Sequence, residues 1–236
     1  MPTLAGHQTQ YMPYPGMLDK LLSADVFVFS DCVQYVKREF QNRNRIRTPE
    51  GWKWVTIPVQ HRHDSLIRET TPLSGKWKES HRSMIQSYYA HSPYLSRMEG
   101  FWDIAETHKE APLSIIAQNT AQYLAELLDA TRYKKVKIIL ESDLHLTPKE
   151  TSTATSRIIA LCKRLGCDRY LSGTGAHAYL ETSPWEKEGI ELAWQDFNPQ
   201  PYTQQYSGWE PNLSTVDLVL NVADPSEYLR VARTSA

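Results

Sequence analysis

Two polar segments near the start of the chain hold side chains suited to chemistry. The first, GHQTQYMPYPG at residues 6–16, carries His7, Gln8 and Tyr11 in a turn rich in Pro and Gly. An imidazole in such a turn, together with the N-terminal amides of a following helix, can bind an anion. A turn histidine that bonds only to backbone groups explains the pattern equally well. The segment therefore indicates an anion site without requiring one.

The second segment, QYVKREFQNRNRIR at residues 34–47, concentrates positive charge in a chain whose formal net charge is only −1. Its single acid, Glu39, stands against five cations: Lys37, Arg38, Arg43, Arg45 and Arg47. Guanidinium forks and Asn amides together can bind a phosphate or a carboxylate bidentately. A solvated charged hairpin is the alternative, and composition alone favours it.

The two faces of a strand separate these side chains. Arg43, Arg45 and Arg47 share the odd face with Lys37, whereas the even positions of the segment share the other face. The even face is the candidate inward face, with Arg38 and Asn44 on it. We predict an anion-binding wall and place Arg47 at the surface. The residues of the predicted wall are Arg38, Asn42, Asn44 and Arg45.

The surrounding pattern predicts an α/β fold. Residues 3–6 and 26–30 are apolar strand candidates, and between them Pro15 begins a helix that carries three leucines on one face. A strand–helix–strand unit of this kind implies parallel strands, and the loops at their carboxyl ends bind ligands. His7 lies at one such end, and Asp31 and Gln34 lie at the next.

The rest of the chain extends this architecture. Residues 52–59 and 65–73 are a candidate strand pair, and apolar spacing predicts a helical insertion or subdomain over about residues 77–131. Strands at 136–144, 169–173 and 190–197, a helix at 152–165 stopped by Gly166, and two C-terminal helices follow. We predict one domain over residues 1–236, with a Rossmann-like, mainly parallel sheet and flanking helices.

Two later segments add candidate ligand contacts. The turn at residues 171–180 follows a strand, and its glycines let backbone amides approach an anion, although its spacing is neither a dinucleotide fingerprint nor a P-loop. In the loop before the next-to-last helix, helix capping explains the polar residues Asn212 and Ser214 without a function, whereas the aromatic residues could equally stack on a sugar or a base. The candidates are Ser172, Gly173, Thr174, Gly175, Tyr202, Asn212 and Ser214.

Composition narrows the class of protein. Hydrophobic residues make up 41% of the 236 residues and charged residues 22%, as in globular proteins. The balanced charge argues against a protein built wholly for nucleic acid. The three cysteines lack metal or disulfide spacing, so we predict no metal site, and Cys32 is a remote candidate nucleophile. We see no signal peptide and no membrane-spanning segment, and expect a cytoplasmic protein.

Taken together, three stretches resemble the WbqC-like proteins. They are residues 7–59, the YLSGTGAHAYL turn at 170–180, and the segment QDFNPQPYTQQYSGWEPNLSTVDLVLN at 195–221. The resemblance runs from residue 6 to about residue 221. It departs from the family pattern at Thr9, where the family has Pro, and at Cys32, where an acidic residue is frequent. The second departure leaves any role borrowed for position 32 in doubt.

The resemblance implies a role in bacterial surface polysaccharide, such as O-antigen lipopolysaccharide, because a family member is a proposed glycine transferase acting on an amino sugar. The leading hypothesis is therefore amide formation between an activated amino acid or acyl group and an amine. The donor is unknown; ATP with Mg²⁺ and an aminoacyl-tRNA are the candidates. His7, Asp31 and Arg45 are the predicted catalytic residues, with Asp31 positioning the amine or Mg²⁺. Two alternatives are a non-catalytic protein that binds a sugar nucleotide or tRNA, and a Cys32-dependent acyltransferase.

Overall fold

The computed structural model describes residues 1–178, 180–181 and 183–234, so Tyr179 of the turn at 171–180 lies outside the described residues. A five-stranded sheet lies at the centre, and each of its neighbouring strand pairs is parallel. The mixed α/β class and the mainly parallel sheet predicted from the sequence are confirmed. Across the sheet the strands are β7 (Lys137–Leu140), β2 (Val26–Ser30), β1 (Thr3–Gln8), β8 (Arg169–Ser172) and β9 (Glu191–Trp194).

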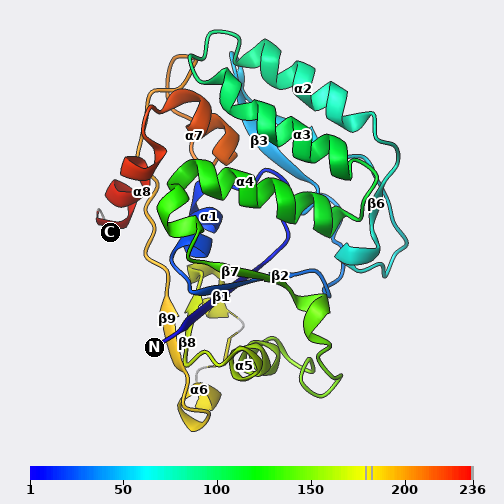
Figure 1. Ribbon diagram of the computed structural model, residues 1–236, viewed down its shortest axis with the longest axis vertical. Helices are drawn as coiled ribbons and strands as arrows, with labels where there is room; N and C mark the ends of the chain where they lie inside the picture. The colour runs from blue at the N-terminus through cyan, green and yellow to red at the C-terminus, as the bar shows by residue number, and fades with distance from the viewer. Residues whose placement is uncertain (179, 182, 235–236) are drawn as a thin grey trace.

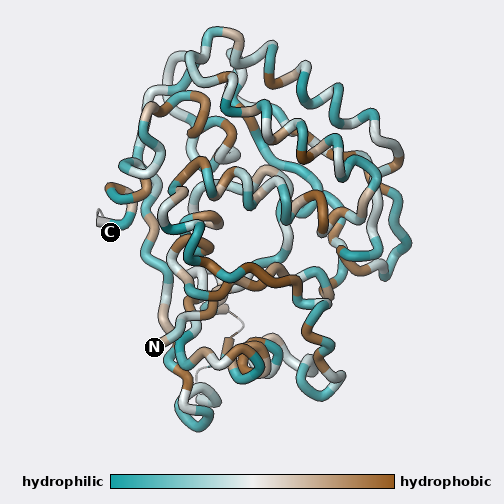
Figure 2. Tube along the Cα trace, in the orientation of Figure 1, coloured by the Kyte–Doolittle hydropathy of each residue, from teal (hydrophilic) through white to brown (hydrophobic). Residues whose placement is uncertain are grey.

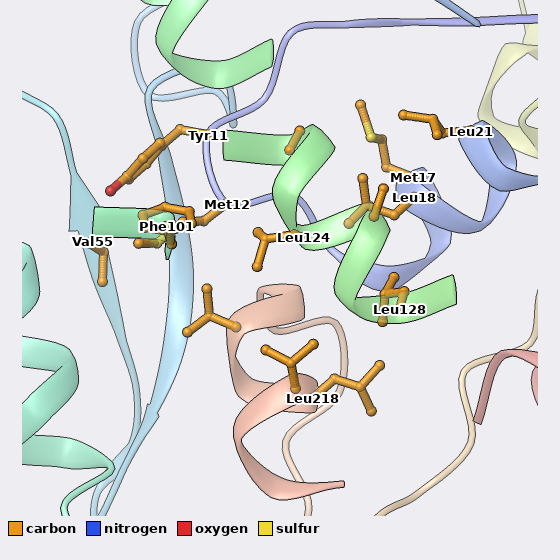
Figure 3. Packing of buried hydrophobic residues seen from close by; sticks show 14 of the residues in the cluster. Tyr11, Met12, Met17, Leu18, Leu21, Val55, Phe101, Leu124, Leu128 and Leu218 are labelled. Carbon is orange, nitrogen blue, oxygen red and sulfur yellow. The ribbon is translucent and has the colours of Figure 1, made fainter. Parts of the chain in front are cut away.

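The first strand–helix–strand unit forms as its sequence predicts. Helix α1 (Pro15–Leu22) has Pro15 in its first turn, where the missing N–H needs no partner, and connects β1 to the parallel β2. Every residue of α1 is buried. Leu18 and Leu21 belong to the same core cluster as Leu124 and Leu128 of α4 (Leu113–Tyr133), and Figure 3 shows these four side chains.

Helices cover both faces of the sheet (Figure 1). Alternation along the strands divides the core accordingly: Ala5, Phe27 and Phe29 face the cluster beneath α1 and α4, whereas Leu4 and Val28 face the cluster beneath α5. Because both faces are covered, β2 and β7 are apolar along most of their length, as the brown tube in Figure 2 shows. The remaining helices are α5 (Ala154–Leu165), α6 (Ser183–Lys187), α7 (Thr215–Asn221) and α8 (Pro225–Thr234).

The long connection from β2 to β7 holds two small hairpins and the expected helical block. Strands β3 (Arg43–Thr48) and β4 (Gly51–Thr56) form an antiparallel pair, as do β5 (Val59–Gln60) and β6 (Thr71–Pro72). The helices after them are α2 (Trp77–Tyr88), α3 (Glu99–His108) and α4. Helix α4 packs on α1 over the central sheet, so the block shares the main core.

Several predicted boundaries shift for local reasons. The strand predicted over residues 52–59 divides in two. Its pairing with β3 ends at Thr56, and Pro58 has no N–H to donate to a neighbouring strand. Helix α5 begins after Thr153, whose hydroxyl accepts a hydrogen bond from the amide of Ser156. It ends as predicted at Gly166, which has a φ of 66°.

Candidate functional site

The sheet order creates a topological switch point beside the first strand. The chain leaves β1 toward β2 with helices on one face, and later places β8 on the other side of β1 with α5 on the opposite face (Figure 1). The connections diverge at the carboxyl ends of β1 and β8, and ligands of open α/β sheets bind at such a position. A cavity of about 940 Å³ lies there. Polar residues on its wall include His7, Gln8, Gln10, Lys20, Ser172 and Gln195.

Lys20 supplies a buried cation to this cavity. Only 5% of the residue is exposed, and its Nζ atom donates a hydrogen bond to the carbonyl oxygen of Gly6 at 2.9 Å. Desolvation by burial lowers the pKa of Lys20 to about 8. Among the described residues, no carboxylate forms an ion pair with it. Because the ammonium is desolvated and lacks a counter-charge, it favours an anion in the cavity.

The His7 imidazole lies beside that cation at the end of β1. Its Nδ1 atom is 2.9 Å from the carbonyl oxygen of Gln8. A carbonyl only accepts, so Nδ1 carries the proton and Nε2 keeps its lone pair. Burial, and then the charge of Lys20, lower the pKa of His7 to about 3. The ring is therefore neutral near pH 7 and offers a hydrogen-bond acceptor.

The loop after β8 forms the opposite wall. Ser172 is 2% exposed, and the predicted contacts Ser172, Gly173, Thr174 and Gly175 all line the cavity. A Cβ atom added to Gly173 would lie 3.7 Å from Nζ of Lys20, so the loop backbone passes close to the ammonium. The residues before α5, with the cap Thr153, complete this side. Backbone amides and a helix N-terminus thus flank the same space as Lys20.

A second polar group in the cavity has no partner. The Oε1 atom of Gln10 is buried and, among the described residues, accepts no hydrogen bond. Gln195 closes the neighbouring wall, because its amide donates to Gly16 O and to Asp19 Oδ2, each at 2.8 Å. Gly16 must be glycine there, since a Cβ atom would lie 2.5 Å from the Tyr14 ring. The cavity wall therefore includes a glutamine whose buried Oε1 atom has no partner among the described residues.

The predicted anion-binding wall at residues 38–45 is only partly placed near the cavity. Asn44 and Asn42 point inward, but their amides donate to Met12 O and Ile57 O, each at 2.8 Å, and so support the backbone. Arg38 is not on the inward face of a strand: it lies in an exposed turn with a φ of 71°. Arg45 donates from Nη2 to Asn212 O at 3.1 Å, and Asn212 lines the cavity. Arg45 therefore contacts a residue of the cavity wall but does not itself line the cavity.

The surface position predicted for Arg47 is wrong. It shares the outward face of the hairpin with Arg43 and Arg45, but the chain near residues 204–208 covers it and leaves 3% exposed. Its guanidinium donates to Thr48 O at 2.6 Å and to Gly51 O at 2.7 Å. Further bonds reach Gln204 Oε1 and Ser207 O. Arg47 is thus a buried cross-link between the hairpin and a distant loop.

Three predicted contacts fulfil structural roles. Tyr11 is fully buried in the core, where its hydroxyl is 3.0 Å from Nδ1 of His81. The Tyr202 hydroxyl donates to Asp217 Oδ2 at 2.6 Å. The Ser214 side chain caps α7 by accepting from the amide of Val216. None of these three residues lines the cavity at the switch point.

Asp31, Cys32 and Gln34 follow the end of β2 and do not line the switch-point cavity. Asp31 is 1% exposed, and its two carboxylate oxygens accept from the amide and hydroxyl of Ser142 at 3.0 Å and 2.8 Å. Cys32 borders a second cavity of about 380 Å³. Burial, followed by the charges of Asp31 and Glu141, raises the pKa of Cys32 to about 11. Gln34 donates to His63 O at 2.8 Å on the surface.

Sequence reasoning missed Lys20 and the two cavity glutamines, Gln10 and Gln195. The DKLL sequence of α1 is typical of a helix with one solvated face, but every residue of α1 is buried and Lys20 lies beside Gly6 and Gly173. The sequence signal available for Lys20 was its position in the helix that connects the first two parallel strands. Among the described residues no group of three His, Cys, Asp or Glu side chains is placed to hold a metal ion. No described helix is long and apolar enough to cross a membrane.

A comparison with known families matches a profile described as the WbqC-like protein family over residues 8–227. The chain belongs to the WbqC-like protein family. One similar relative is the uncharacterized protein Rv1507c of Mycobacterium tuberculosis (strain ATCC 25618 / H37Rv), which is 29% identical over 231 residues. The match covers 96% of each chain. No solved structure matches the chain. The resemblance found in the sequence is thereby confirmed for this WbqC-like chain.

Proposed function

We propose that the switch-point cavity is the active site of a transferase that forms an amide. In this reaction an amine nitrogen attacks the carbonyl carbon of an activated amino acid or acyl group. The bond to the leaving oxygen of an adenylate, acyl phosphate or aminoacyl-tRNA ester then breaks. The nitrogen loses one proton, and the leaving group departs with the bonding electron pair. An amino sugar used in surface polysaccharide is the acceptor that family membership favours.

The observation that carries the proposal is the desolvated Lys20 ammonium, which pairs with no carboxylate of the described residues and lies beside His7 and Gly173. Amide formation from such donors develops negative charge on the carbonyl oxygen and on the leaving group. A fixed cation in a site with little water stabilises that charge more than it stabilises the neutral ground state. Backbone amides of residues 173–175 and the start of α5 lie on the same cavity wall.

His7 and Gln10 are suited to hold the amine. The Nε2 lone pair of His7 can accept an N–H, and within the described part of the chain Gln10 Oε1 is an acceptor that has no partner. As the nitrogen becomes positive during attack, His7 can take its proton. An anionic donor bound at Lys20 would favour this step, because it offsets the positive charge that helps to depress the pKa of His7.

The alternative of a Cys32 nucleophile receives no support from the geometry. The thiol lies against the carboxylate of Asp31, with the Sγ atom 3.7 Å from Oδ1. The raised pKa keeps it protonated near neutral pH, whereas a catalytic thiol needs a lowered one. A sugar-nucleotide or tRNA binding protein without chemistry would use the same cavity cation, so turnover has to decide between binding and transfer.

The test is an assay of amide formation by mass spectrometry. Donors are glycine with ATP and Mg²⁺, and glycyl-tRNA; the acceptors are amino sugars and their nucleotide conjugates. The expected result is product formation by the wild type, lost by at least about a hundredfold in Lys20→Met and His7→Gln. The exposed Lys135→Met is the matched control. Unchanged turnover in both cavity variants, or donor binding without product from any pair, would overturn the proposal.

A further inference from the structure

The outward face of the β3–β4 hairpin carries cations and aromatic rings in alternation. We call Arg43, Arg45, Trp52 and Trp54 the Arg–Trp ladder. Arg45 pairs directly across the strands with Trp54. The Cζ atom of Arg43 lies 3.9 Å from the centroid of the Trp54 ring, and that of Arg45 lies 5.1 Å from the Trp52 ring and 5.9 Å from the Trp54 ring. Each guanidinium is thus held against an indole.

Core packing does not account for this face. On the other side of the same strands, Ile46 and Val55 are fully buried and form the contact with the core. Trp52, by contrast, leaves 43% of its surface exposed. The turn before β3 extends the ladder, because Phe40 packs on Trp54 with ring centroids 5.6 Å apart. The result is an exposed aromatic surface on a well-ordered hairpin.

The charge of the surface is mainly positive, and Glu39 is the exposed acid of the adjoining turn. Among the described residues, neither Arg43 nor Arg45 forms an ion pair, and the Nη2 atom of each donates to a backbone carbonyl that fixes the guanidinium. Lys37 and Arg38 lie exposed in the adjoining turn, whose Arg38 carbonyl accepts a bond from Arg43. An anionic ligand would therefore meet cations that are already positioned.

The chemistry of the polar groups narrows the ligand. Guanidinium and indole N–H groups only donate hydrogen bonds. A neutral glycan carries no charge to pair with the two guanidinium groups. A phosphodiester only accepts. Flat bases stack on tryptophan and on guanidinium planes, and repeated stacking beside cations is how single strands are bound.

We propose that the Arg–Trp ladder binds single-stranded nucleic acid, with phosphates on the arginines and bases stacked on Trp52 and Trp54. The ladder contacts the wall of the switch-point cavity at one point, because Arg45 donates to the carbonyl of Asn212 and Asn212 lines the cavity. The inference does not depend on the proposed transfer reaction, since binding is measured without a donor or an acceptor.

The test is fluorescence anisotropy of a labelled uridine oligonucleotide of about 12 nucleotides, from about 50 to about 200 mM salt. A matching deoxythymidine strand and an RNA duplex form two further arms. We expect the single strands to bind, with affinity that falls steeply with salt, and the duplex to bind at least about tenfold more weakly. Comparison of the RNA and DNA strands shows whether the 2′-hydroxyl contributes.

Variants assign the binding to the ladder. Trp52→Ala should weaken binding by about tenfold and Trp52→Phe by less, because stacking is worth about 1–3 kcal/mol per base. The double variant Arg43→Ala/Arg45→Ala should also reduce, by about two, the slope of log affinity against log salt concentration. Lys134→Ala with Lys135→Ala removes the same charge from a distant exposed site and should change neither quantity.

Three outcomes would overturn the proposal. They are absence of single-strand binding at the lowest salt, equal loss in the Lys134/Lys135 control, and full binding by Trp52→Ala. Displacement of the oligonucleotide by a neutral dextran at similar affinity would assign the surface to glycans instead. Circular dichroism and the melting temperature of each variant establish that the hairpin is folded, and Trp52→Phe keeps the test decisive if Trp52→Ala is unstable.

Discussion

Lys20 Nζ donates to the carbonyl oxygen of Gly6 at 2.9 Å, which fixes a cation one residue before His7 at the end of β1. The bond holds the ammonium in place but does not neutralise it. A charge buried without a counter-charge is costly to the folded protein, so its retention points to a ligand rather than to stability. The first two predictions concern this relationship.

Lys20→Met should separate stability from ligand binding. Replacing a desolvated ammonium with an apolar side chain of similar length should leave the melting temperature equal or higher. Binding of pyrophosphate, measured by calorimetry, should weaken by at least about tenfold. Lys135→Met, at an exposed site, serves as the charge-matched control. Equal pyrophosphate affinity in Lys20→Met and wild type would remove Lys20 from the anion site.

The pH dependence of anion binding should follow Lys20. Below its pKa of about 8 the ammonium is charged and binds pyrophosphate; above it, affinity should fall. Stability moves the other way, because between about pH 8 and about pH 10.5 the unfolded chain holds a proton that the folded chain has released. That contribution therefore raises the free energy of unfolding as pH rises. An affinity that is flat from about pH 7 to about pH 10 would contradict the assignment.

Acid should destabilise the fold through His81. Its Nε2 donates to Thr56 O at 3.0 Å, and burial lowers its pKa to about 4. Below about pH 6.5 the unfolded chain takes up a proton that the folded chain excludes, so stability falls as pH decreases toward 4. The loss from about pH 7 to about pH 5 should be about 2 kcal/mol. Urea titrations of wild type and His81→Gln check this, because the variant should lose that part of the pH dependence of the free energy of unfolding.

Arg47→Ala should destabilise the protein by about 3 kcal/mol, because it strands buried carbonyl groups that the guanidinium now satisfies. Arg47→Lys should recover little, since an ammonium cannot reproduce the planar fork. Arg43→Ala, on the same face, should cost less than about 1 kcal/mol. Urea midpoints measure all three. Similar midpoints for Arg47→Ala and Arg43→Ala would show that the cross-link is unimportant.

Cys32 should react slowly with iodoacetamide near neutral pH. Its pKa of about 11 leaves a very small thiolate fraction, despite its partial exposure. The alkylation rate, followed by intact mass, should lie well below that of free glutathione and rise with pH. Asp31→Asn removes one of the charges that raise the pKa, so it should speed labelling. Rapid alkylation of wild-type Cys32 would contradict the raised pKa and support the alternative of a Cys32-dependent acyltransferase.

The sequence was sufficient for the elements whose signals are local. The apolar run at β2 and the Pro15 start of α1 predict the parallel pair, and Gly166 marks the end of α5. Residues 172–175 were placed on the ligand side of the sheet because strand ends share an edge. These inferences need only periodicity, turn chemistry and handedness.

The residues that were misplaced or missed in the sequence analysis depend on contacts between distant parts of the chain. Arg47 is buried by residues some 160 positions later in the sequence, and nothing in its own neighbourhood signals that cover. Tyr11 meets His81 of α2, and Lys20 is buried beside Gly6 of β1 and Gly173 of the loop after β8. Charge and polarity alone therefore assign such residues to the surface or to a site.

The position of β1 between β2 and β8 also constrains the order in which the molecule can be built during translation. Its pairing with β2 is available once a short length of chain has emerged. The other edge of β1 must wait until α5 and β8 have been synthesised. Until then the nascent chain presents an open, apolar strand edge, which is a risk for aggregation. The cavity at the switch point has residues of both β1 and β8 on its wall, so it can form only after that edge has closed, late in the synthesis of the chain.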